Sequence, residues 1–324
     1  MSLLLAIMGA GGNWSGAAWA NRFAARLPDH PALLWTGEHA AEASGELTAI
    51  KYAAVWKPPL GLLARCPNLR AIFNLGAGVD ALLADSSLPR HVPLVRVANA
   101  DLTKRMTEYV TLHVLLQHRR QRALDAAQRA RTWAAPEQWA AGAVRVGIMG
   151  LGELGRDAAE VLARLGFAVR GWSRQPRDIP GVACFAGVAG LDAFLGGTDI
   201  LVVLLPLTSG TRGLLDRQLF HKLARDGVLG GPVLINAGRG GLQIEADILD
   251  SLDDGTLLAA TLDVFETEPL PPASRLWAHP KVALTPHNAA DSDPEAICDD
   301  IAAQIQAFER GEPLKNVVDR AREY

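Results

Sequence analysis

The chain has 324 residues, 49% of them hydrophobic and 21% charged, with a formal net charge of −3 at pH 7. This length suits two domains, and the composition can bury a full core, so an intrinsically disordered chain is excluded. Proteins that bind nucleic acid usually carry a basic excess or a basic stripe, so we expect no nucleic-acid partner. We interpret the short basic run "HRRQR" at 118–122 as a solvated helix end.

The three cysteines, Cys66, Cys184 and Cys298, lie far apart and form no CxxC pair, which predicts a reducing compartment and no zinc site. The apolar start "LLLAIMG" has no charged segment in front of it and is too short for a secretory signal. No window approaches the roughly 20 apolar residues that a membrane span requires. We therefore expect a cytoplasmic protein that binds neither a metal nor a membrane.

Short apolar runs typical of β-strands alternate with helical patterns along the whole chain, which predicts βαβ units and parallel sheets. In the first third, strands are predicted at 3–8, 32–35, 53–56, 69–75 and 92–97. A second series begins at Val144, with strands predicted at 144–149, 167–172, 199–205, 232–236, 258–265 and 281–286. We therefore expect an α/β protein of two doubly wound domains.

Two long helices bracket the second strand series. The first is predicted over 101–130, where apolar side chains wrap most of the surface and indicate a buried helix: Met106, Tyr109, Val110, Leu112, Val114, Leu115 and Leu116. The second begins with Asp293 as N-cap and Pro294 as first helical residue, and Gly311 ends it. We infer that a central domain, residues 102–288, is inserted into a domain formed by 1–101 and 289–324.

The stretch "VRVGIMGLGELG" carries G-x-G-x-x-G at Gly150, Gly152 and Gly155, between a predicted strand and a predicted helix. In that context the first glycine permits a tight turn, the second lets the backbone approach a pyrophosphate, and the third lets helix and strand pack closely. The earlier stretch "MGAGGN" looks similar, but Trp14 stands where the third glycine belongs. We therefore predict a dinucleotide site in the central domain and interpret "MGAGGN" as a loop of the other domain.

The strand after the glycine loop ends in "GWSRQPRD", and its polar residues bear on the choice of dinucleotide. An acidic side chain there would bind the ribose hydroxyls of NAD. A hydroxyl and a guanidinium suit the 2′-phosphate of NADP instead. Ser173 and Arg174 occupy the place, which favours NADP over NAD. The alternative is that Asp178 binds the ribose and that Arg174 is merely exposed.

Three polar side chains follow predicted strands of the second series: Arg239 in "INAGRGG", Glu268 in "DVFETEPL" and His287 in "TPHNAA". Because the carboxyl ends of parallel strands line the ligand crevice, we expect the three to act together. Arg239 can hold a carboxylate, His287 can give or take a proton near neutral pH, and Glu268 can orient the imidazole. Taken singly, such a histidine is more often structural and a Glu-Pro pair is often only a turn. The three residues together, beside a dinucleotide loop, indicate catalysis.

Seven stretches resemble the D-isomer-specific 2-hydroxyacid dehydrogenases, most closely their glyoxylate/hydroxypyruvate reductase branch. They lie in family order over residues 73–287: "FNLGAGVD", "VGIMGLGELG", "GWSR", "LLPLTSGTRGLLD", "LINAGRG", "LDVFETEPLP" and "HPKVALTPH". The resemblance implies a Rossmann cofactor domain inserted into a flavodoxin-like substrate domain. The chain departs from the family pattern at two places, and both leave the identity of the substrate open. Lys57 follows Trp56, and "NAAD" follows His287 where the family often has a glycine or serine.

The resemblance also implies an activity, the reduction of a small 2-oxo acid to the D-2-hydroxy acid with NADPH. Arg239 is implied as the substrate anchor, Glu268 as the partner of the histidine, and His287 as the acid that protonates the nascent alkoxide. The backbone of the "LGAGVD" loop, at Ala77 and Gly78, is implied to grip the substrate carboxylate. Cofactor contacts are implied for the glycine loop and for Glu153, Leu154, Leu205, Pro206, Ala237 and Asp263.

Several alternatives stay open. An NAD-linked dehydrogenase with another substrate range would share these motifs, and so would a dinucleotide-sensing corepressor-like protein. Trp56 is expected to cap the substrate pocket, or else to pack in the core of its domain. Trp133 and Trp139 lie on a connector, and the resembling family dimerises through this part of the cofactor domain. We therefore expect a homodimer in which one of these rings contacts the partner, unless both fold back onto their own subunit.

Overall fold

The computed structural model of the protein describes residues 2–8, 14–37 and 44–324. The chain forms two compact units, one made of Met1–Asp101 and Ser292–Tyr324, the other of Leu102–Asp291. The stretch "MGAGGN", interpreted above as a loop, falls almost entirely on residues 9–13 and so lies outside the described residues. Among the helices that are described, none is long and apolar enough to cross a membrane.

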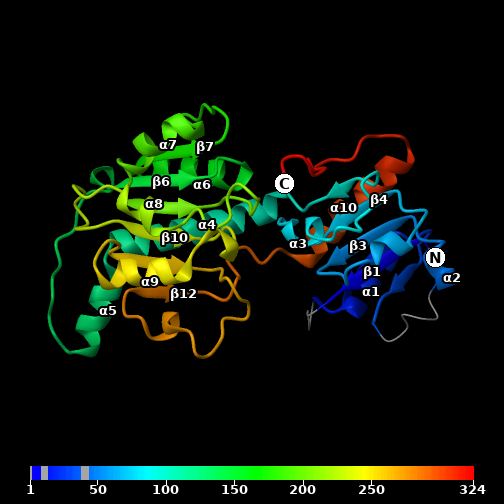
Figure 1. The fold of residues 1–324 in the computed structure, drawn as a ribbon, viewed down its shortest axis with the longest axis horizontal. Helices are drawn as coiled ribbons and strands as arrows, with labels where there is room; N and C mark the ends of the chain where they lie inside the picture. The colour runs from blue at the N-terminus through cyan, green and yellow to red at the C-terminus, as the bar shows by residue number, and fades with distance from the viewer. Residues whose placement is uncertain (1, 9–13, 38–43) are drawn as a thin grey trace. The chain divides into compact units, whose positions relative to one another are not determined.

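The first unit is built on a five-stranded sheet in the order β2-β1-β3-β4-β5, with every neighbouring pair parallel (Figure 1). Its strands are β1 (Leu3–Ile7), β2 (Ala32–Leu34), β3 (Tyr52–Trp56), β4 (Ala71–Asn74) and β5 (Leu94–Val95). This 2-1-3-4-5 order is that of flavodoxin-like sheets. Its helices are α1 (Gly16–Arg26), α2 (Ser44–Leu47), η2 (Leu63–Arg65), α3 (Asp80–Leu83) and α10 (Pro294–Glu309).

Helix α10 comes from the far end of the chain and packs beside α1. Arg22 Nε lies 2.6 Å from a Glu295 carboxylate oxygen, and Arg26 binds both Glu295, at 2.8 Å, and Asp299. The side chain of Asp293 caps the helix by accepting from Glu295 N, and Pro294 follows it, as the sequence predicts. The last helix therefore returns to the first unit.

The second unit contains a seven-stranded parallel sheet in the order β12-β11-β10-β9-β6-β7-β8. Counted from β6, this order contains the 3-2-1-4-5-6 arrangement of dinucleotide-binding Rossmann folds. Its strands are β6 (Arg145–Met149), β7 (Ala168–Ser173), β8 (Ala183–Ala186), β9 (Ile200–Val203), β10 (Val233–Asn236), β11 (Ala259–Leu262) and β12 (Val282–Leu284). The predicted fold class is confirmed.

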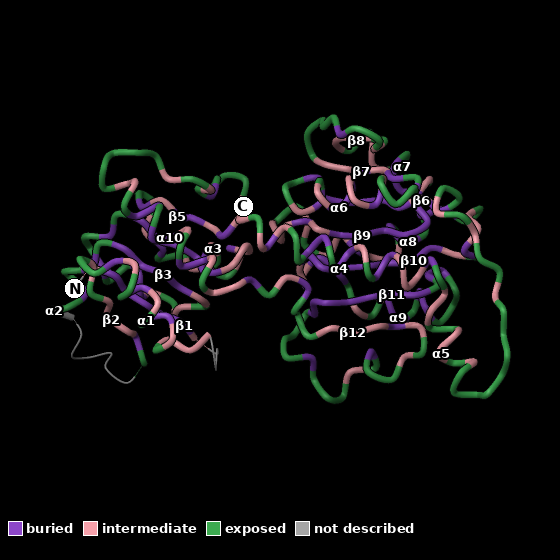
Figure 2. Tube along the Cα trace, turned by 180° about the vertical axis from the view of Figure 1, so that it is seen from behind, coloured by how far each residue is buried: buried purple, intermediate pink, exposed green. Residues whose placement is uncertain are grey.

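Helices cover both faces of this sheet, which explains why its central strands are continuous apolar runs. Along β9, Ile200 and Val202 join one core with α4 and α6, while Leu201 and Val203 join a second core with α7, α8 and α9. All four side chains are fully buried, as Figure 2 shows for the strand. The helices are α4 (Ala100–His118), α5 (Gln121–Arg129), η3 (Ala141–Ala143), α6 (Glu153–Arg164), α7 (Gly187–Leu195), α8 (Arg217–His221), η4 (Gly240–Leu242), α9 (Glu245–Asp253) and η5 (Arg275–Ala278).

The structure adds one strand that was not predicted and contradicts three sequence expectations about these elements. The short edge strand β8 was not predicted. The single helix expected over 101–130 is broken between α4 and α5, where Arg120 adopts a left-handed backbone with φ +55°. Leu112, expected to be buried, is 54% exposed, whereas Met106, Tyr109, Val110 and Val114 do lie in the core. The run at 118–122 is not wholly solvated, since His118 is buried against Phe167.

We call residues 121–140, which comprise α5 and the connector to β6, the arm. None of its residues, all of which are described, is buried (Figure 2). Trp133 is 100% exposed. Trp139 instead packs against the core of the second unit, with the Arg120 guanidinium 5.4 Å from its ring centre. The two tryptophans of the arm therefore have different environments.

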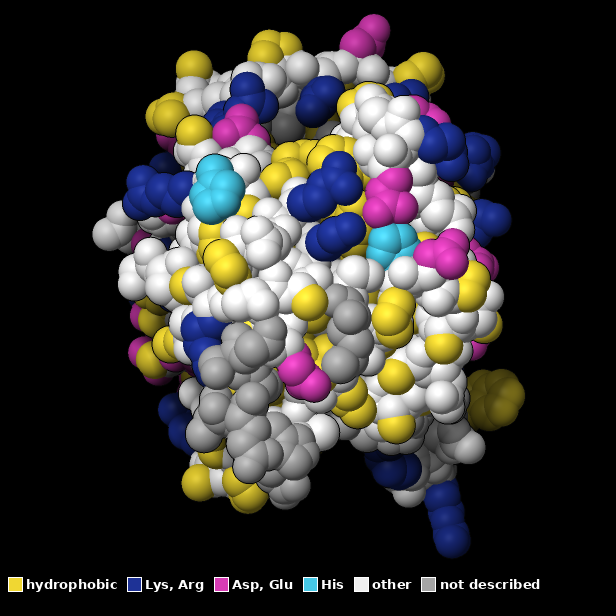
Figure 3. Space-filling model, turned by 90° about the vertical axis from the view of Figure 1, so that its right-hand side faces the viewer, with side chains coloured by type: hydrophobic (Ala, Val, Ile, Leu, Met, Phe, Trp, Pro, Cys, Tyr) yellow, Lys and Arg dark blue, Asp and Glu magenta, His cyan; other side chains and the backbone are white. Residues whose placement is uncertain are grey.

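Charge is mixed over the surface. On the face that Figure 3 draws, the described Lys and Arg side chains are interspersed with Asp, Glu and hydrophobic side chains. The same mixture appears in the ion pairs, of which Arg145 bound to both Asp199 and Asp226 at 2.7 Å is an example. This arrangement agrees with the small net charge of −3.

Candidate functional site

The three glycines of the loop between β6 and α6 have three different surroundings. Gly150 has φ +114°, and a Cβ there would lie 2.8 Å from the carbonyl oxygen of Leu204. A Cβ on Gly155 would lie 1.8 Å from the Gly150 oxygen, so only glycine allows the helix to start this close to the strand. Around Gly152 a Cβ would meet nothing within 4 Å. Gly150 and Gly155 therefore allow close approach of backbone segments, and Gly152 leaves open space for a ligand.

Helix α6 begins at Glu153, with Gly152 as its N-cap and no side chain capping it. The first N–H groups of a helix have no acceptor within the helix and carry a partial positive charge, which suits phosphate groups. The loop also follows β6, which neighbours both β7 and β9, the place where the strand order reverses. Dinucleotides bind at that place in such sheets. The residues present therefore fit the diphosphate of a dinucleotide.

A hollow of about 370 Å³ adjoins this loop and is lined by Leu151, Gly152, Glu153, Arg156, Pro176, Arg177, Asp178 and Ile179. Ser173, the last residue of β7, is half-buried, and its hydroxyl donates to the carbonyl oxygen of Gln175 at 2.6 Å. Arg174 is exposed. Both residues proposed for the 2′-phosphate lie at the carboxyl end of β7, while the alternative, Asp178, lines the hollow itself.

The other residues implied as cofactor contacts follow neighbouring strands of the sheet. Leu205 and Pro206 come after β9, Ala237 comes directly after β10, and Asp263 comes directly after β11. Because these strands are parallel, the four residues share the edge that carries the glycine loop. Among the residues that the structure describes, no group of three or more His, Cys, Asp and Glu side chains is placed to hold a metal ion.

His287 and Glu268 form a direct pair at this edge. His287 Nδ1 lies 2.7 Å from Glu268 Oε2, and the two side chains are 41% and 27% exposed. The other Glu268 oxygen accepts from the backbone N–H of Phe265 at 3.1 Å. Because the carboxylate is an acceptor, Nδ1 carries the proton of this bond and Nε2 is left for another partner. The pair can therefore present one nitrogen of an oriented imidazole to a ligand.

The backbone of His287 is held in an uncommon conformation, with φ +53°. Its N–H lies 2.8 Å from the carbonyl oxygen of Asp263 and 3.0 Å from that of Thr285. A non-glycine residue keeps such a backbone only where its surroundings fix it, and such residues gather at functional sites. The carboxylate of Asp263, 1% exposed, accepts from the N–H groups of Asn288 and Ala289 at 3.0 and 3.1 Å. Asp263 therefore also fixes the loop that carries His287.

Arg239 follows β10, the strand beside β11, and is half-buried. Its Nη1 donates to the carbonyl oxygen of Gly238 at 2.8 Å. The side-chain amide of Asn236 holds this loop. Its NH₂ group donates to the carbonyl oxygen of Arg239 and to Gln243 Oε1. Its oxygen accepts from Gly238 N. Gln243 in turn donates to the carbonyl oxygen of Val264, in the segment that leads to Glu268. The buried amides of Asn236 and Gln243 thus connect the Arg239 loop to the segment that leads to Glu268.

In the first unit, Ala77 and Gly78 lie in the loop between β4 and α3 and are half-buried. Asn74, 3% exposed, donates through its amide to the carbonyl oxygens of Gly76 and Gly78, each at 2.8 Å. No described residue accepts from the backbone N–H of Ala77 or Gly78. The loop therefore has its carbonyls engaged and these N–H groups available to an anion.

Trp56 ends β3, the strand next to β4, and is half-buried. A Cβ on Gly76 would lie 2.3 Å from its indole, and Trp14 lies 5.9 Å away between ring centres. Lys57 has φ +48° and places its ammonium 5.8 Å from the Trp56 ring centre. Trp56 thus packs beside Trp14 and against Gly76, the first residue of the Gly76–Gly78 loop.

Sequence reasoning did not single out the buried amide side chains that hold these loops: Asn74, Asn236 and Gln243. One signal was present, because the apolar runs "AIFN" and "VLIN" both end in asparagine. Both asparagines are almost fully buried. A buried amide at the end of a parallel strand must find hydrogen-bond partners, so it marks a loop that is held in place.

Comparison with known proteins agrees with this geometry. The model of the D-isomer specific 2-hydroxyacid dehydrogenase NAD binding domain matches residues 111–289. The glyoxylate/hydroxypyruvate reductase A of Serratia proteamaculans is 41% identical over 306 residues, 93% of this chain and 94% of that protein.

Solved structures are similar over the whole chain. An NADPH-dependent glyoxylate/hydroxypyruvate reductase from Sinorhizobium meliloti, in complex with NADP and sulfate, has a TM-score of 0.92 and 45% identity, covering 100% of this chain and 99% of that one. A probable 2-hydroxyacid dehydrogenase from Rhizobium etli, in complex with NADP, HEPES and L(+)-tartaric acid, has a TM-score of 0.92 and 44% identity over the same shares. The predicted resemblance is confirmed: this chain belongs to the D-isomer-specific 2-hydroxyacid dehydrogenase family.

Proposed function

We propose that the protein reduces a small 2-oxo acid of the glyoxylate or hydroxypyruvate type to the D-2-hydroxy acid with NADPH. The observation that carries the proposal is the pair of His287 and Glu268, 2.7 Å apart, on the sheet edge that also carries the glycine loop. Relatives that bear the name glyoxylate/hydroxypyruvate reductase, and similar structures that hold NADP, support the choice of substrate and cofactor. We assign dinucleotide binding to the second unit and substrate binding to the first.

The overall reaction consumes one 2-oxo acid, one NADPH and one proton, and yields the 2-hydroxy acid and NADP⁺. NADPH, when bound, supplies the hydride. The protein must then supply the proton that the carbonyl oxygen takes up. In our proposal His287 gives this proton from Nε2, while Glu268 holds Nδ1–H and stabilises the charged ring. The guanidinium of Arg239 binds the substrate carboxylate or carbonyl oxygen, a task for which its planar set of donors is suited.

We propose that the N–H groups of Ala77 and Gly78 hold the substrate carboxylate. The carbonyl oxygens of Gly76 and Gly78 already accept from Asn74. The N–H groups are therefore the polar groups that this loop can offer to a ligand. For the cofactor we propose contacts from Gly150, Gly152 and Gly155 and from Glu153, Leu154, Leu205, Pro206, Ala237 and Asp263. Ser173 and Arg174 remain our candidates for the 2′-phosphate, with Asp178 the alternative that would favour NAD.

Steady-state assays at 340 nm test this proposal directly. We expect NADPH oxidation with glyoxylate and hydroxypyruvate, a lower kcat/KM with pyruvate and phenylpyruvate, and a higher kcat/KM for NADPH than for NADH. A preference for NADH would overturn the assignment of Ser173 and Arg174. Dinucleotide binding without turnover of any 2-oxo acid would overturn the enzymatic proposal in favour of a dinucleotide sensor.

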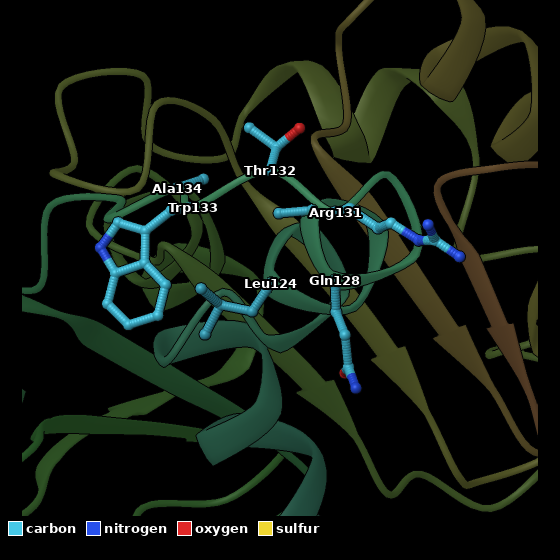
Figure 4. A pocket seen from close by; sticks show the side chains of 7 residues that line it. Leu124, Gln128, Arg131, Thr132, Trp133 and Ala134 are labelled. Carbon is cyan, nitrogen blue, oxygen red and sulfur yellow. The ribbon is translucent and has the colours of Figure 1, made fainter.

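We also propose that the protein is a homodimer that contacts its partner through the arm, and that it works in the reducing cytoplasm, where its three free cysteines are stable. The arm leaves Trp133 fully exposed beside a hollow of about 440 Å³, lined by the residues around Leu124 and Trp133 (Figure 4). A large exposed aromatic ring costs free energy in water and is typical of protein interfaces. Trp139 already packs on its own subunit, so Trp133 is the residue proposed to contact the partner.

Light scattering tests the dimer. We expect a dimer at micromolar concentration, and we expect Trp133→Ser to weaken it at least about tenfold, as loss of an aromatic interface anchor does. Trp277→Ser is the matched control, because Trp277 is also exposed, at 57%, but lies outside the arm. A monomeric wild type, or equal dimer affinity for the two variants, contradicts the proposal.

A further inference from the structure

We infer that Tyr109 is a positioning residue for His287, acting through Thr285 and Asp263; the inference rests on the proposed function of His287. Tyr109 lies on α4, far in sequence from the His287 loop. Its hydroxyl oxygen lies 2.8 Å from Thr285 Oγ1, and Thr285 Oγ1 lies 2.7 Å from Asp263 Oδ1. Tyr109 and Asp263 are both buried.

The direction of these hydrogen bonds follows from chemistry. The carboxylate of Asp263 only accepts, so Thr285 must donate its single hydroxyl hydrogen to Asp263. Thr285 can then only accept from Tyr109, which makes Tyr109 the donor. The order is therefore Tyr109 to Thr285 to Asp263, and the phenol fixes the rotamer in which the threonine serves the carboxylate.

Asp263 connects this series to the catalytic loop. Its Oδ1 also accepts from Asn288 N and its Oδ2 accepts from Ala289 N, the two residues after His287. Its backbone carbonyl accepts from His287 N at 2.8 Å. The loop therefore turns around Asp263 on both sides of His287. The left-handed backbone of His287 needs such support, and hydrogen bonds from Tyr109 and Thr285 complete it.

The surroundings leave few other groups to take over this role. Among the described residues, no Lys or Arg forms an ion pair with Asp263. His113, also on α4, has its ring centre 4.2 Å from that of Tyr109. Burial lowers the pKa of His113, so the ring stays neutral near pH 7 and does not compensate the carboxylate charge. The buried carboxylate therefore depends on its hydrogen-bond donors.

The variant Tyr109→Phe keeps the ring and removes only the donor. We expect kcat for glyoxylate reduction to fall about three- to tenfold, the consequence of one lost buried hydrogen bond. KM for glyoxylate should stay within about twofold of wild type, because the change affects His287 and not the residues proposed to bind the substrate. Tyr52→Phe is the matched control: Tyr52 is also buried, and its hydroxyl also makes one hydrogen bond, to Glu309 at 3.2 Å in the first unit.

A double-mutant cycle shows whether Tyr109 acts through Thr285. Thr285→Val should lower kcat at least as much as Tyr109→Phe, Thr285→Ser should retain it, and Tyr109→Phe should add nothing in the Thr285→Val background. Full additivity of the two changes would overturn the inference. So would an unchanged kcat in Tyr109→Phe, or an equal loss in Tyr52→Phe.

Amide hydrogen exchange gives a readout that needs no turnover. We expect Asn288 and Ala289 to exchange faster in Tyr109→Phe than in wild type and than in Tyr52→Phe. Equal exchange in all three proteins refutes the positioning role. If the wild type reduces no 2-oxo acid, the proposed function fails while this exchange measurement still decides whether Tyr109 orders the loop.

Discussion

The substitution Glu268→Gln removes the charge beside His287 while preserving the shape of the side chain. In the native pair Glu268 accepts at both oxygens, from His287 Nδ1 at 2.7 Å and from Phe265 N at 3.1 Å. A glutamine has one oxygen and one NH₂ group. If the oxygen stays with Phe265, the NH₂ group faces His287 Nδ1 and opposes the doubly protonated ring that gives the proton. If the amide turns around, Phe265 N loses its acceptor.

The size of the effect follows from this pair. A hydrogen bond to a charged group contributes about 1.5–3 kcal/mol. The side chains are 41% and 27% exposed, so solvent screens the pair and places it at the lower end of that range. A loss of about 1.5–2 kcal/mol in the transition state corresponds to a kcat lowered roughly ten- to thirtyfold. KM for NADPH should not change, because Glu268 is not among the proposed cofactor contacts.

The assay compares kcat of Glu268→Gln with that of Glu266→Gln, two residues earlier. Glu266 is exposed and accepts from Glu245 N at 2.7 Å, a bond that a glutamine oxygen preserves. We expect the control to keep wild-type kcat and both proteins to keep their melting temperature. A Glu268→Gln enzyme within about twofold of wild type, or an equal loss in the control, would refute the assigned role of Glu268.

Three further predictions concern the cofactor, the substrate and the pH dependence of stability. Arg174→Asp should shift the ratio of kcat/KM for NADPH and NADH toward NADH, because a carboxylate repels the 2′-phosphate; an unchanged ratio would remove Arg174 from the site. Trp56→Ala should raise activity on phenylpyruvate relative to glyoxylate, and the exposed Trp277→Ala should not; equal ratios would reject Trp56 as a cap. Burial raises the pKa of Tyr52 to about 12 and that of Tyr109 further. Both phenols therefore stabilise the folded state at pH values below about 10, the pKa of an unfolded tyrosine. This stabilisation is lost as the pH rises above about 10. Absorbance at 295 nm should show their ionisation only together with alkaline unfolding, and full ionisation of all tyrosines near pH 10 in the folded protein would contradict this.

The parallel sheets and the loops that carry the candidate catalytic residues could be predicted because their signals are local. Each of Arg239, Glu268 and His287 follows an apolar run, and parallel strands place such residues on one edge. The distance between His287 and Glu268 was beyond sequence reasoning, because it depends on how two loops fold after their strands. The glycine motif was the most informative stretch, since the structure shows a steric demand for glycine at Gly150 and Gly155.

Other features depend on packing that the sequence does not display. Strand β8 has the small sequence "ACFA" at a sheet edge, too short for a periodicity to be visible. The break at Arg120 interrupts a pattern that would allow one helix, and nothing in "HRRQR" marks a left-handed residue. Trp133 and Trp139 share one connector and similar neighbours, so only the structure separates the exposed ring from the packed one.

The most direct test of the central claim is to follow the hydride. The protein is incubated with hydroxypyruvate and NADPH that carries deuterium at C4 of the nicotinamide on the transferred face, and the product is analysed by NMR and chiral chromatography. The proposed function predicts D-glycerate with one deuterium at C2, formed at a rate that falls about 10²–10⁴-fold in His287→Ala, the range for a lost general acid. L-glycerate, a product without deuterium, or an undiminished rate in His287→Ala would contradict it.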